Sequence, residues 1–378
     1  MTEAAYAVTA PGLEAVLEEE LRALGAQELR VDRGGVAMKV DRAALYRVHL
    51  HARVPVRVRV RLGDFRSKNL EMLGNGVKGL AWARYVHPRQ RLTVQVLSAG
   101  ARLPSGAERK VIHAVQDALR GVPAGRGGPP AKLPPAAILV RIDGDRAEVS
   151  VDASGERLHR RGWRRDTTEA PLRENLAAAV LALAEWDPSE PLVDPMCGSG
   201  TFPIEAATIA RGLPPGAGRR FAFEAWPSHD PALWAQIRGE KGPPAGDGPI
   251  FGYDIDPSAV DAARANARRA QVAERVTLRV APAEQLVLPE RPGLVVCNPP
   301  YGARIGGARA AWRALGAALR RAEGWRVALV VPEPGLLAAS GLSIPRIARF
   351  DNGGIPVALH VGPAVGGGSS GGRGRGRG

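Results

Sequence analysis

The stretch LVDPMCGSGTFPIEAA, residues 192–207, decides the fold class of this chain. It predicts a short apolar strand that ends in Asp194, then a glycine turn, then a helix. Gly198 and Gly200 allow the backbone to approach a ligand closely, and the N-terminus of the following helix offers free N–H groups. A strand, a glycine turn and a helix in this order indicate a nucleotide-binding α/β sheet. A tight turn without a ligand is the alternative interpretation.

Strands and helices alternate from about residue 170 onwards, which is typical of a parallel, doubly wound sheet. The apolar patterns predict strands at residues 191–194, 250–254, 276–280, 293–297 and 325–331, and helices at 170–186, 201–211, 257–271 and 308–322. We expect residues 345–361 to add an antiparallel pair at the sheet edge. Residues 212–249 are rich in Pro and Gly and predict a partly helical insertion.

A second acid follows the next strand of this pattern. The segment GYDIDP, residues 252–257, places Asp254 at the C-terminal tip of the strand. In nucleotide-binding α/β sheets, an acid at this position hydrogen-bonds the hydroxyls of a ribose. Asp256 instead suits the N-cap of the helix that begins with Pro257.

The most specific signal is the tetrapeptide NPPY, Asn298 to Tyr301, directly after the apolar strand LVVC. An exocyclic amine on a base is a poor nucleophile because its lone pair is delocalised into the ring. The side-chain oxygen of Asn298 and the carbonyl of Pro299 can each accept one N–H, which favours a pyramidal nitrogen with its lone pair aimed at an electrophile. Pro299 and Pro300 fix the backbone, and Tyr301 offers a ring for the base to stack on. An ordinary Pro-Pro turn is the alternative interpretation.

Positive charge is concentrated in the first part of the chain. Residues 1–165 contain 29 Lys and Arg against 17 Asp and Glu, a formal charge of +12, whereas residues 166–378 contain 23 against 21, or +2. Arg outnumbers Lys 46 to 6, and codon bias explains that ratio but not the location of the excess. The asymmetry predicts that the first part docks a polyanion, and we expect nucleic acid.

Residues 54–62, VPVRVRVRL, lie within this basic part and alternate strictly between apolar and basic side chains. The alternation predicts a half-buried strand with a cationic outer face. A solvated edge that blocks aggregation is the alternative interpretation.

The composition excludes several classes of protein. Cys197 and Cys297, the two cysteines, are too few for a disulfide framework or a four-ligand zinc site. The apolar runs are far shorter than the ~18 residues that span a bilayer. Residues 1–20 contain no basic residue, so they do not form a secretory signal. We therefore expect a cytoplasmic protein without a membrane or metal partner.

The segments DPMCGSGTFPIEAA and NPPYG resemble the class I S-adenosylmethionine-dependent methyltransferases that modify exocyclic amines. Upstream, NLEMLGNGVKGLAWARYV and DASGERLHRRGWR resemble a THUMP RNA-binding domain and its junction. Together they are similar to the THUMP-containing guanine-N2 methyltransferases of RNA, over about residues 5–361. FAFEAW, residues 221–226, is more typical of the branch that acts on large-subunit (23S) ribosomal RNA than of the transfer-RNA branch.

The resemblance implies an α/β protein whose domains follow one another along the chain. They are an α+β ferredoxin-like subdomain at residues 1–50, a THUMP domain at 51–154, a basic linker at 155–169 and a Rossmann-like class I methyltransferase domain at 170–362. The last of these has a mostly parallel, seven-stranded sheet. The Gly/Arg tail at 363–378 cannot bury a core, so we expect it to be disordered.

The resemblance also implies functional residues. Catalysis is expected from Asn298, Pro299, Pro300 and Tyr301, and S-adenosylmethionine binding from Asp194, Met196, Cys197, Gly198, Gly200, Thr201, Asp254 and Glu284. Two positions depart from the family's pattern. Pro282 stands where many members have an acid that binds the adenine amine, so Glu284 or a backbone group must replace it. Ala303 stands where an acid is expected after YG.

The resulting hypothesis is a methyltransferase that acts on the N2 amine of a guanosine in 23S ribosomal RNA, with the base flipped into the NPPY site. Guanine N2 of transfer RNA, adenine N6 of a nucleic acid and the amide of a protein glutamine are alternative targets of the same chemistry, since NPPY does not select the base. The basic, RNA-binding first part argues against the last two. An inactive RNA-binding factor is an alternative of a different class. The intact Asp194, Asp254 and NPPY argue against such a loss of activity.

Overall fold

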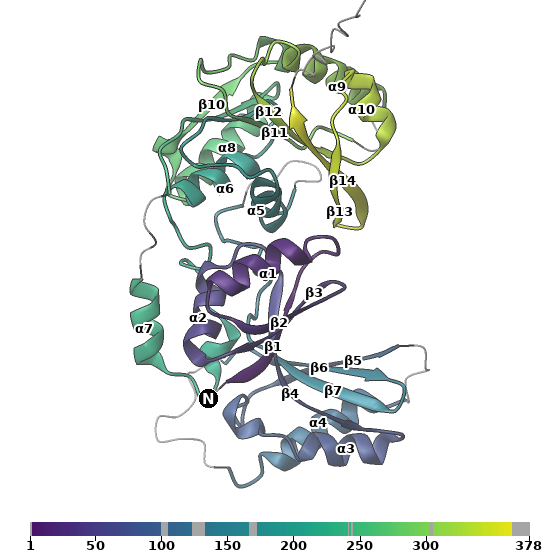
Figure 1. The fold of residues 1–378 in the computed structure, drawn as a ribbon. Coiled ribbons are helices and arrows are strands. Elements are labelled where there is room, and N and C mark those ends of the chain that lie inside the picture. The colour runs from purple at the N-terminus through teal and green to yellow at the C-terminus, as the bar shows by residue number, and fades with distance from the viewer. Residues whose placement is uncertain are drawn as a thin grey trace, which may run out of the picture. The chain divides into compact units, whose positions relative to one another are not determined.

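The computed structural model describes residues 2–99, 105–122, 133–165, 172–240, 242, 245–301 and 305–364, which form two compact units (Figure 1). The first unit consists of Met1–Gly162 and Leu213–Gly242, and the second of Trp163–Gly212 and Pro243–Gly378. Residues 166–169 of the predicted linker and the predicted tail from residue 365 lie outside the described residues, as does Ala303.

The first unit is built on a seven-stranded sheet with the order β2-β3-β1-β4-β7-β6-β5. Only the pair of β5 and β6 is parallel. The strands are β1 (Glu3–Val8), β2 (Gln27–Asp32), β3 (Gly35–Val40), β4 (Arg57–Arg66), β5 (Leu92–Ala99), β6 (Ala136–Asp143) and β7 (Arg146–Asp152). The helices are α1 (Glu14–Ala23), α2 (Arg42–His51), α3 (Leu70–Lys78) and α4 (Ala107–Ala118). Helices α3 and α4 lie side by side (Figure 1).

Strand β4 contains most of the segment predicted at residues 54–62. Val58 and Val60 are fully buried while Arg57, Arg59 and Arg61 are half-buried, so the half-buried strand is confirmed. The cationic face is less open than the sequence suggests. Arg57 forms an ion pair with Asp152, and Arg61 forms one with Glu148, and both acids belong to the neighbouring strand β7.

The second unit is built on another seven-stranded sheet, with the order β10-β9-β8-β11-β12-β14-β13. Strands β8 to β12 are parallel, and β14 runs antiparallel to both β12 and β13. The strands are β8 (Leu192–Asp194), β9 (Ile250–Asp254), β10 (Val276–Val280), β11 (Leu294–Cys297), β12 (Arg326–Val331), β13 (Arg346–Asn352) and β14 (Ile355–Pro363). The predicted mostly parallel sheet and its antiparallel edge pair are therefore confirmed.

Helices pack on this second sheet because their apolar side chains cover its central strands. They are α5 (Glu174–Leu183), α6 (Thr201–Ala210), α8 (Pro257–Arg269), α9 (Ile305–Leu319) and α10 (Pro334–Ser340). All four residues of β11 are buried. Trp312 of α9 is fully buried in the same hydrophobic cluster as Val295 and Cys297 of that strand. This packing fixes where β11 ends and NPPY begins.

The insertion expected at residues 212–249 is partly helical, as predicted, and most of it belongs to the first unit. Its helix α7 spans Pro231–Gly239. Tyr46 of α2 stacks on Phe223 with ring centroids 4.6 Å apart, and meets Trp234 edge-on at 5.3 Å. The sequence places this segment within the methyltransferase domain, whereas its aromatic side chains are buried with those of the first unit.

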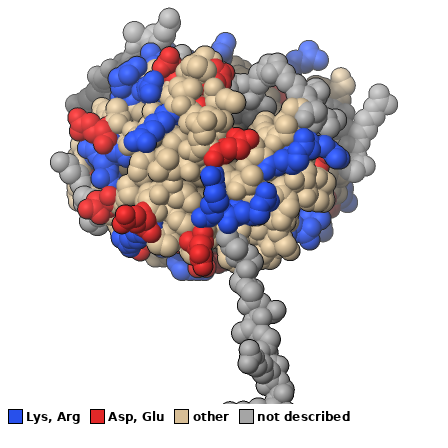
Figure 2. Space-filling model, turned by 90° about the horizontal axis from the view of Figure 1, so that it is seen from above, with Lys and Arg blue, Asp and Glu red and all other residues tan. Residues whose placement is uncertain are grey.

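The molecule seen from above, where α9 and α10 lie, carries Lys and Arg side chains interspersed with Asp and Glu (Figure 2). A mixture of both signs fits the nearly balanced charge of residues 166–378. Among the helices that the structure describes, none combines the length and the apolar character needed to cross a bilayer.

Candidate cofactor and active site

The turn after β8 is tied by hydrogen bonds to the end of β9. Met196 donates its backbone N–H to Asp194 Oδ1 over 3.1 Å, and Gly198 donates its own to Asp254 Oδ2 over 2.8 Å. The N–H of Cys197 is bonded to the carbonyl of Tyr253 at 2.8 Å. The loop after β8 therefore connects Asp194 and Asp254, the two acids predicted to bind the cofactor, through hydrogen bonds.

The two glycines of this loop are required by its backbone. Gly198 has φ +51° and Gly200 has φ +87°, a region that side-chain-bearing residues rarely adopt. A Cβ at Gly200 would also lie 3.0 Å from the Cβ of Ala263. The N–H of Gly198 bonds Asp254 and that of Gly200 bonds the carbonyl of Cys197 at 2.8 Å. These two N–H groups therefore close the turn, and the role of the two glycines in cofactor binding stays a prediction.

Asp194 is the buried acid of the site, with 2% of its surface exposed. Burial raises the pKa of its carboxyl well above the ordinary value, and the neighbouring Asp254 raises it further. Hydrogen bonds from the Met196 N–H and from the Cys297 thiol oppose that rise. A cation placed beside Asp194 favours its ionised form, so the carboxyl suits a positively charged ligand.

The two cysteines are free and buried, and each borders this acid pair. Burial raises the pKa of both thiols well above the usual value, and the charges of Asp194 and Asp254 act in the same direction. Both thiols therefore stay protonated and are poor nucleophiles. Cys197 and Cys297 therefore act as small, unreactive side chains in this site.

Asp254 is half-buried, and both of its oxygens accept main-chain hydrogen bonds. Besides the bond from Gly198, Oδ1 accepts the N–H of Asp256 over 3.0 Å. Each oxygen keeps a second lone pair, so the oriented carboxylate can also accept ribose hydroxyls. Asp256 caps α8 by accepting the N–H of Ser258 at 2.8 Å, which confirms its predicted N-cap role.

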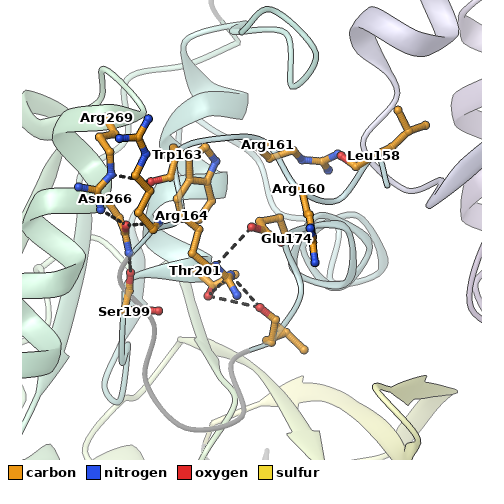
Figure 3. A network of polar contacts seen from close by, with 12 residues as sticks. Leu158, Arg160, Arg161, Trp163, Arg164, Glu174, Ser199, Thr201, Asn266 and Arg269 are labelled. Atoms are coloured by element: carbon orange, nitrogen blue, oxygen red, sulfur yellow. Dashed lines mark hydrogen bonds and ion pairs between the residues drawn. The ribbon is translucent and has the colours of Figure 1, made fainter. Parts of the chain in front are cut away.

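Thr201, predicted to bind the cofactor, is held by an arginine from the chain segment before α5 (Figure 3). Arg164 Nη2 donates to the Thr201 hydroxyl over 2.7 Å and to the carbonyl of Leu172 over 2.8 Å. Its Nε lies 3.3 Å from Glu174 Oε1 in an ion pair that is almost completely buried. The hydroxyl of Thr201 therefore anchors this segment to the first turn of α6.

Asn266 supports the backbone of the glycine loop, a contact that the sequence interpretation missed (Figure 3). Its Nδ2 donates to the carbonyl of Ser199, within the glycine loop, over 3.1 Å. Its Oδ1 accepts from Arg269 and, at 3.3 Å, from the N–H of Arg165. Asn266 is fully buried, although it lies on the apolar face of α8 beside Ala263. A polar residue at an apolar position of the helical repeat is the signal that identifies it.

NPPY begins where β11 ends, and its parts are held differently. Asn298 is half-buried, and its Oδ1 is buried without a hydrogen-bond partner among the described residues. The carbonyl of Pro300 accepts from Trp312 Nε1 over 3.3 Å, which holds the loop on α9. Pro299 is buried. Tyr301 is half-buried and packs against the same hydrophobic cluster as Met196 of the cofactor loop.

Glu284 lies in a one-turn helix, Ala283–Gln285, that follows β10. Its side chain is exposed, and its backbone carbonyl accepts from Arg321. A role for its carboxylate toward an adenine amine stays a prediction. No group of three His, Cys, Asp or Glu side chains among the described residues is placed to hold a metal ion.

Strand order gathers the predicted residues at one edge of the sheet. Strand β8 lies between β9 and β11, and all three are parallel. Asp194, Asp254 and Asn298 therefore stand together at the carboxyl edge, where open α/β sheets bind their ligands. The fold and this site define a Rossmann-like class I methyltransferase.

Comparison with known proteins places the chain within this class. Residues 161–347 match the family described as "RMKL-like, methyltransferase domain", and residues 4–59 match the "RlmL ferredoxin-like domain". A protein of Synechocystis sp. named "Putative RNA methyltransferase" is 32% identical over 366 residues, which cover 94% of this chain and 95% of that protein. The chain belongs to the RMKL-like methyltransferase family.

Two further relatives extend the comparison. "Ribosomal RNA large subunit methyltransferase K/L" of Chromohalobacter salexigens is 36% identical over 95% of this chain, which spans about half (52%) of that protein's length. The crystal structure of "a putative methyltransferase complexed with SAH" has a TM-score of 0.86 and 30% identity, and the match covers 95% of this chain and 97% of that one. The fold class and the S-adenosylmethionine-dependent family expected from the sequence are confirmed.

Proposed function

We propose that this protein methylates the N2 amine of a guanosine in large-subunit ribosomal RNA, with S-adenosylmethionine as the methyl donor. The observation that carries the proposal is the buried Asn298 Oδ1, an acceptor without a donor among the described residues. A buried acceptor of this kind costs free energy unless a ligand supplies the hydrogen bond. An amine N–H at this position supplies it.

The residues around the acid pair suit S-adenosylmethionine. Asp254 presents an oriented carboxylate for the ribose hydroxyls, and the buried Asp194 suits the positive charge of the cofactor. When bound, the cofactor supplies an electrophilic methyl group on a sulfonium. The loop that hydrogen bonds connect to both acids contains the other predicted cofactor residues, Met196, Cys197, Gly198 and Gly200. Thr201 begins α6 directly after this loop, and its hydroxyl accepts from Arg164. Glu284 stays the candidate for the adenine amine.

The chain's own residues prepare the amine. Asn298 Oδ1 and the carbonyl of Pro299 each accept one N–H, which favours a nitrogen whose lone pair faces the methyl group. The stabilisation grows as the nitrogen pyramidalises, so it lowers the barrier more than it strengthens binding. Tyr301 stacks on the flipped base, which has to leave its helix to reach the pocket.

RNA as the substrate is supported by the excess of basic residues at 1–165 and by the names of the two relatives. We assign the docking of RNA to the predicted THUMP domain at residues 51–154. The 23S branch is favoured over transfer RNA because FAFEAW, residues 221–226, is typical of it and because one relative carries a large-subunit name.

The test is methylation of deproteinised ribosomal RNA by the full chain with isotopically labelled S-adenosylmethionine, followed by mass analysis of the nucleosides. Labelled N2-methylguanosine in ribosomal RNA is the expected product. Transfer RNA incubated in a parallel reaction is the matched control, and we expect it to stay unlabelled. Labelled N6-methyladenosine would overturn the choice of guanine. Tight binding of the cofactor and of RNA with no labelled product would identify an RNA-binding factor instead.

A further inference from the structure

A residue far along the chain reaches the NPPY loop. Asn352 is the last residue of β13, and 7% of its surface is exposed. Its Nδ2 donates a hydrogen bond to the Tyr301 hydroxyl over 2.8 Å, across 51 positions of the sequence. The antiparallel edge of the sheet therefore contributes to the loop at the end of β11.

The hairpin that carries Asn352 is rigid at this point. Asn352 pairs with Ile355 across the turn between β13 and β14. The turn uses Gly353 and Gly354 with φ values of +69° and +96°, which glycine adopts without strain. The N–H of Gly354 also donates to Asp351 Oδ1 over 2.6 Å. The amide of Asn352 is thus presented from a fixed backbone.

The Tyr301 hydroxyl accepts a hydrogen bond from Asn352, and Asn298 stands three positions before Tyr301 in the same loop. Burial raises the pKa of this hydroxyl, and its polar interactions with the side chains of Asn352 and Asn298 lower it. An amide that directs its NH₂ group toward this hydroxyl turns its carbonyl oxygen away from it. For Asn298, that oxygen is the buried Oδ1 without a partner among the described residues. A reversed Asn298 amide would instead aim a donor at the N–H groups of a substrate amine.

We propose that Asn352 is a positioning residue for the methyl-transfer reaction: through the Tyr301 hydroxyl, it holds the Asn298 amide with Oδ1 directed at the substrate amine. The inference rests on the proposed function, because it assigns Asn298 the role of amine acceptor. It adds a residue outside NPPY and gives the Tyr301 hydroxyl a task separate from stacking of its ring. The competing explanation is that Asn352 only stabilises its hairpin.

Three substitutions in the full chain separate these explanations. Asn352→Ala removes the donor, Asn352→Leu keeps a similar size but can form no hydrogen bond with the hydroxyl, and Tyr301→Phe keeps the stacking ring but removes the hydroxyl. We expect each to lower the single-turnover rate at saturating cofactor and RNA by roughly tenfold or more, as for coupled neighbours in one network. The dissociation constants for both ligands should stay within about twofold of wild type.

The double variant Asn352→Ala with Tyr301→Phe should be no slower than Tyr301→Phe alone, because both changes break one chain of contacts. Asp351→Ala is the matched control, since it loosens the same turn without touching Tyr301. It should lower thermal stability and leave the rate unchanged. Additive losses in the double variant, full activity of Asn352→Leu, or an equal rate loss in Asp351→Ala would overturn the positioning role.

The wild-type reaction distinguishes this inference from the proposed function. If the wild type methylates adenine rather than guanine, the proposal of guanine as the target base is refuted. The same rate comparisons among the variants then still decide the role of Asn352. If the wild type methylates no RNA at all, both fail. If it forms N2-methylguanosine and the variants keep the wild-type rate, only the inference fails.

Discussion

Gly198 donates its backbone N–H to Asp254 Oδ2 over 2.8 Å, so the loop after β8 and the tip of β9 form one hydrogen-bonded unit. The acid expected to bind the ribose is therefore also the residue that shapes the glycine loop. A change at Asp254 affects both parts of the cofactor site at once.

We expect Asp254→Ala to weaken S-adenosylmethionine binding by roughly tenfold to a hundredfold, the usual cost of losing a hydrogen bond to a charged group. RNA affinity should not change. Titration calorimetry measures the first and filter binding the second. Asp256→Ala is the matched control, because it removes the N-cap of α8 and costs about 1 kcal/mol of stability without touching the ligand. Equal losses of cofactor affinity in both variants would refute the specific role of Asp254.

Asn298→Ala should leave cofactor binding nearly intact and lower the single-turnover rate by roughly 100- to 1000-fold, as for the loss of one preorganised partner of a transition state. Tyr301→Ala should weaken capture of the flipped base as well, because stacking precedes methyl transfer. Single-turnover kinetics over a range of RNA concentrations separate the two effects. A nearly normal rate for Asn298→Ala would leave NPPY as a structural turn.

The affinity for the cofactor should rise with pH. Burial raises the pKa of Asp194, so the folded protein holds a proton that the unfolded chain has already lost. The stability of the free protein therefore falls as pH rises from the ordinary value to the raised one. A bound cation favours the carboxylate, so binding releases that proton and strengthens across the same range. Calorimetry in buffers of different ionisation enthalpy counts the released proton, and Asp194→Asn should release none.

Acid should destabilise the first unit through His49. Its Nδ1–H donates to the carbonyl of Leu45 over 2.8 Å, and burial lowers its pKa from 6.5 to about 4. The unfolded chain binds the proton more tightly, so stability present above the ordinary pKa is lost as pH falls from 6.5 toward 4. The loss approaches about 3 kcal/mol. Thermal unfolding of wild type and His49→Gln should diverge in this window only, and parallel curves would contradict the assignment.

RNA affinity should depend on exposed basic residues of the predicted THUMP domain. Lys68 lies just before α3 and Lys78 is its last residue, and both are exposed. If each contacts one phosphate, its change to Ala should reduce the slope of log affinity against log salt by roughly 0.7 to 0.9. Arg61→Ala is the matched control, because Arg61 is already paired with Glu148. Unchanged slopes for both lysine variants would show that RNA docks on a surface that does not include Lys68 and Lys78.

Local patterns were enough to predict the second sheet and to bring the proposed site residues to one edge of it. The apolar strands, the glycine turn at Gly198 and Gly200, the Asp256 cap and NPPY each depend on neighbouring residues. Backbone constraints and side-chain periodicity act over a few positions, so they can be recognised in sequence. Strands β8 and β9 end in Asp194 and Asp254, and Asn298 directly follows β11. These three residues meet because parallel neighbouring strands share one carboxyl edge.

Pairings between distant residues depended on the tertiary structure. Periodicity shows that Arg57 faces away from the core, but not that Asp152 on another strand neutralises it. It likewise does not show that Arg164 occupies the Thr201 hydroxyl, or that Asn352 reaches Tyr301. Such contacts form because burial requires each polar group to find a partner, and which partner is near is decided by how the sheet and helices pack. The sequence by itself determined the fold class and the methyltransferase family, and only the folded chain decided which side chains hold the proposed site residues in place.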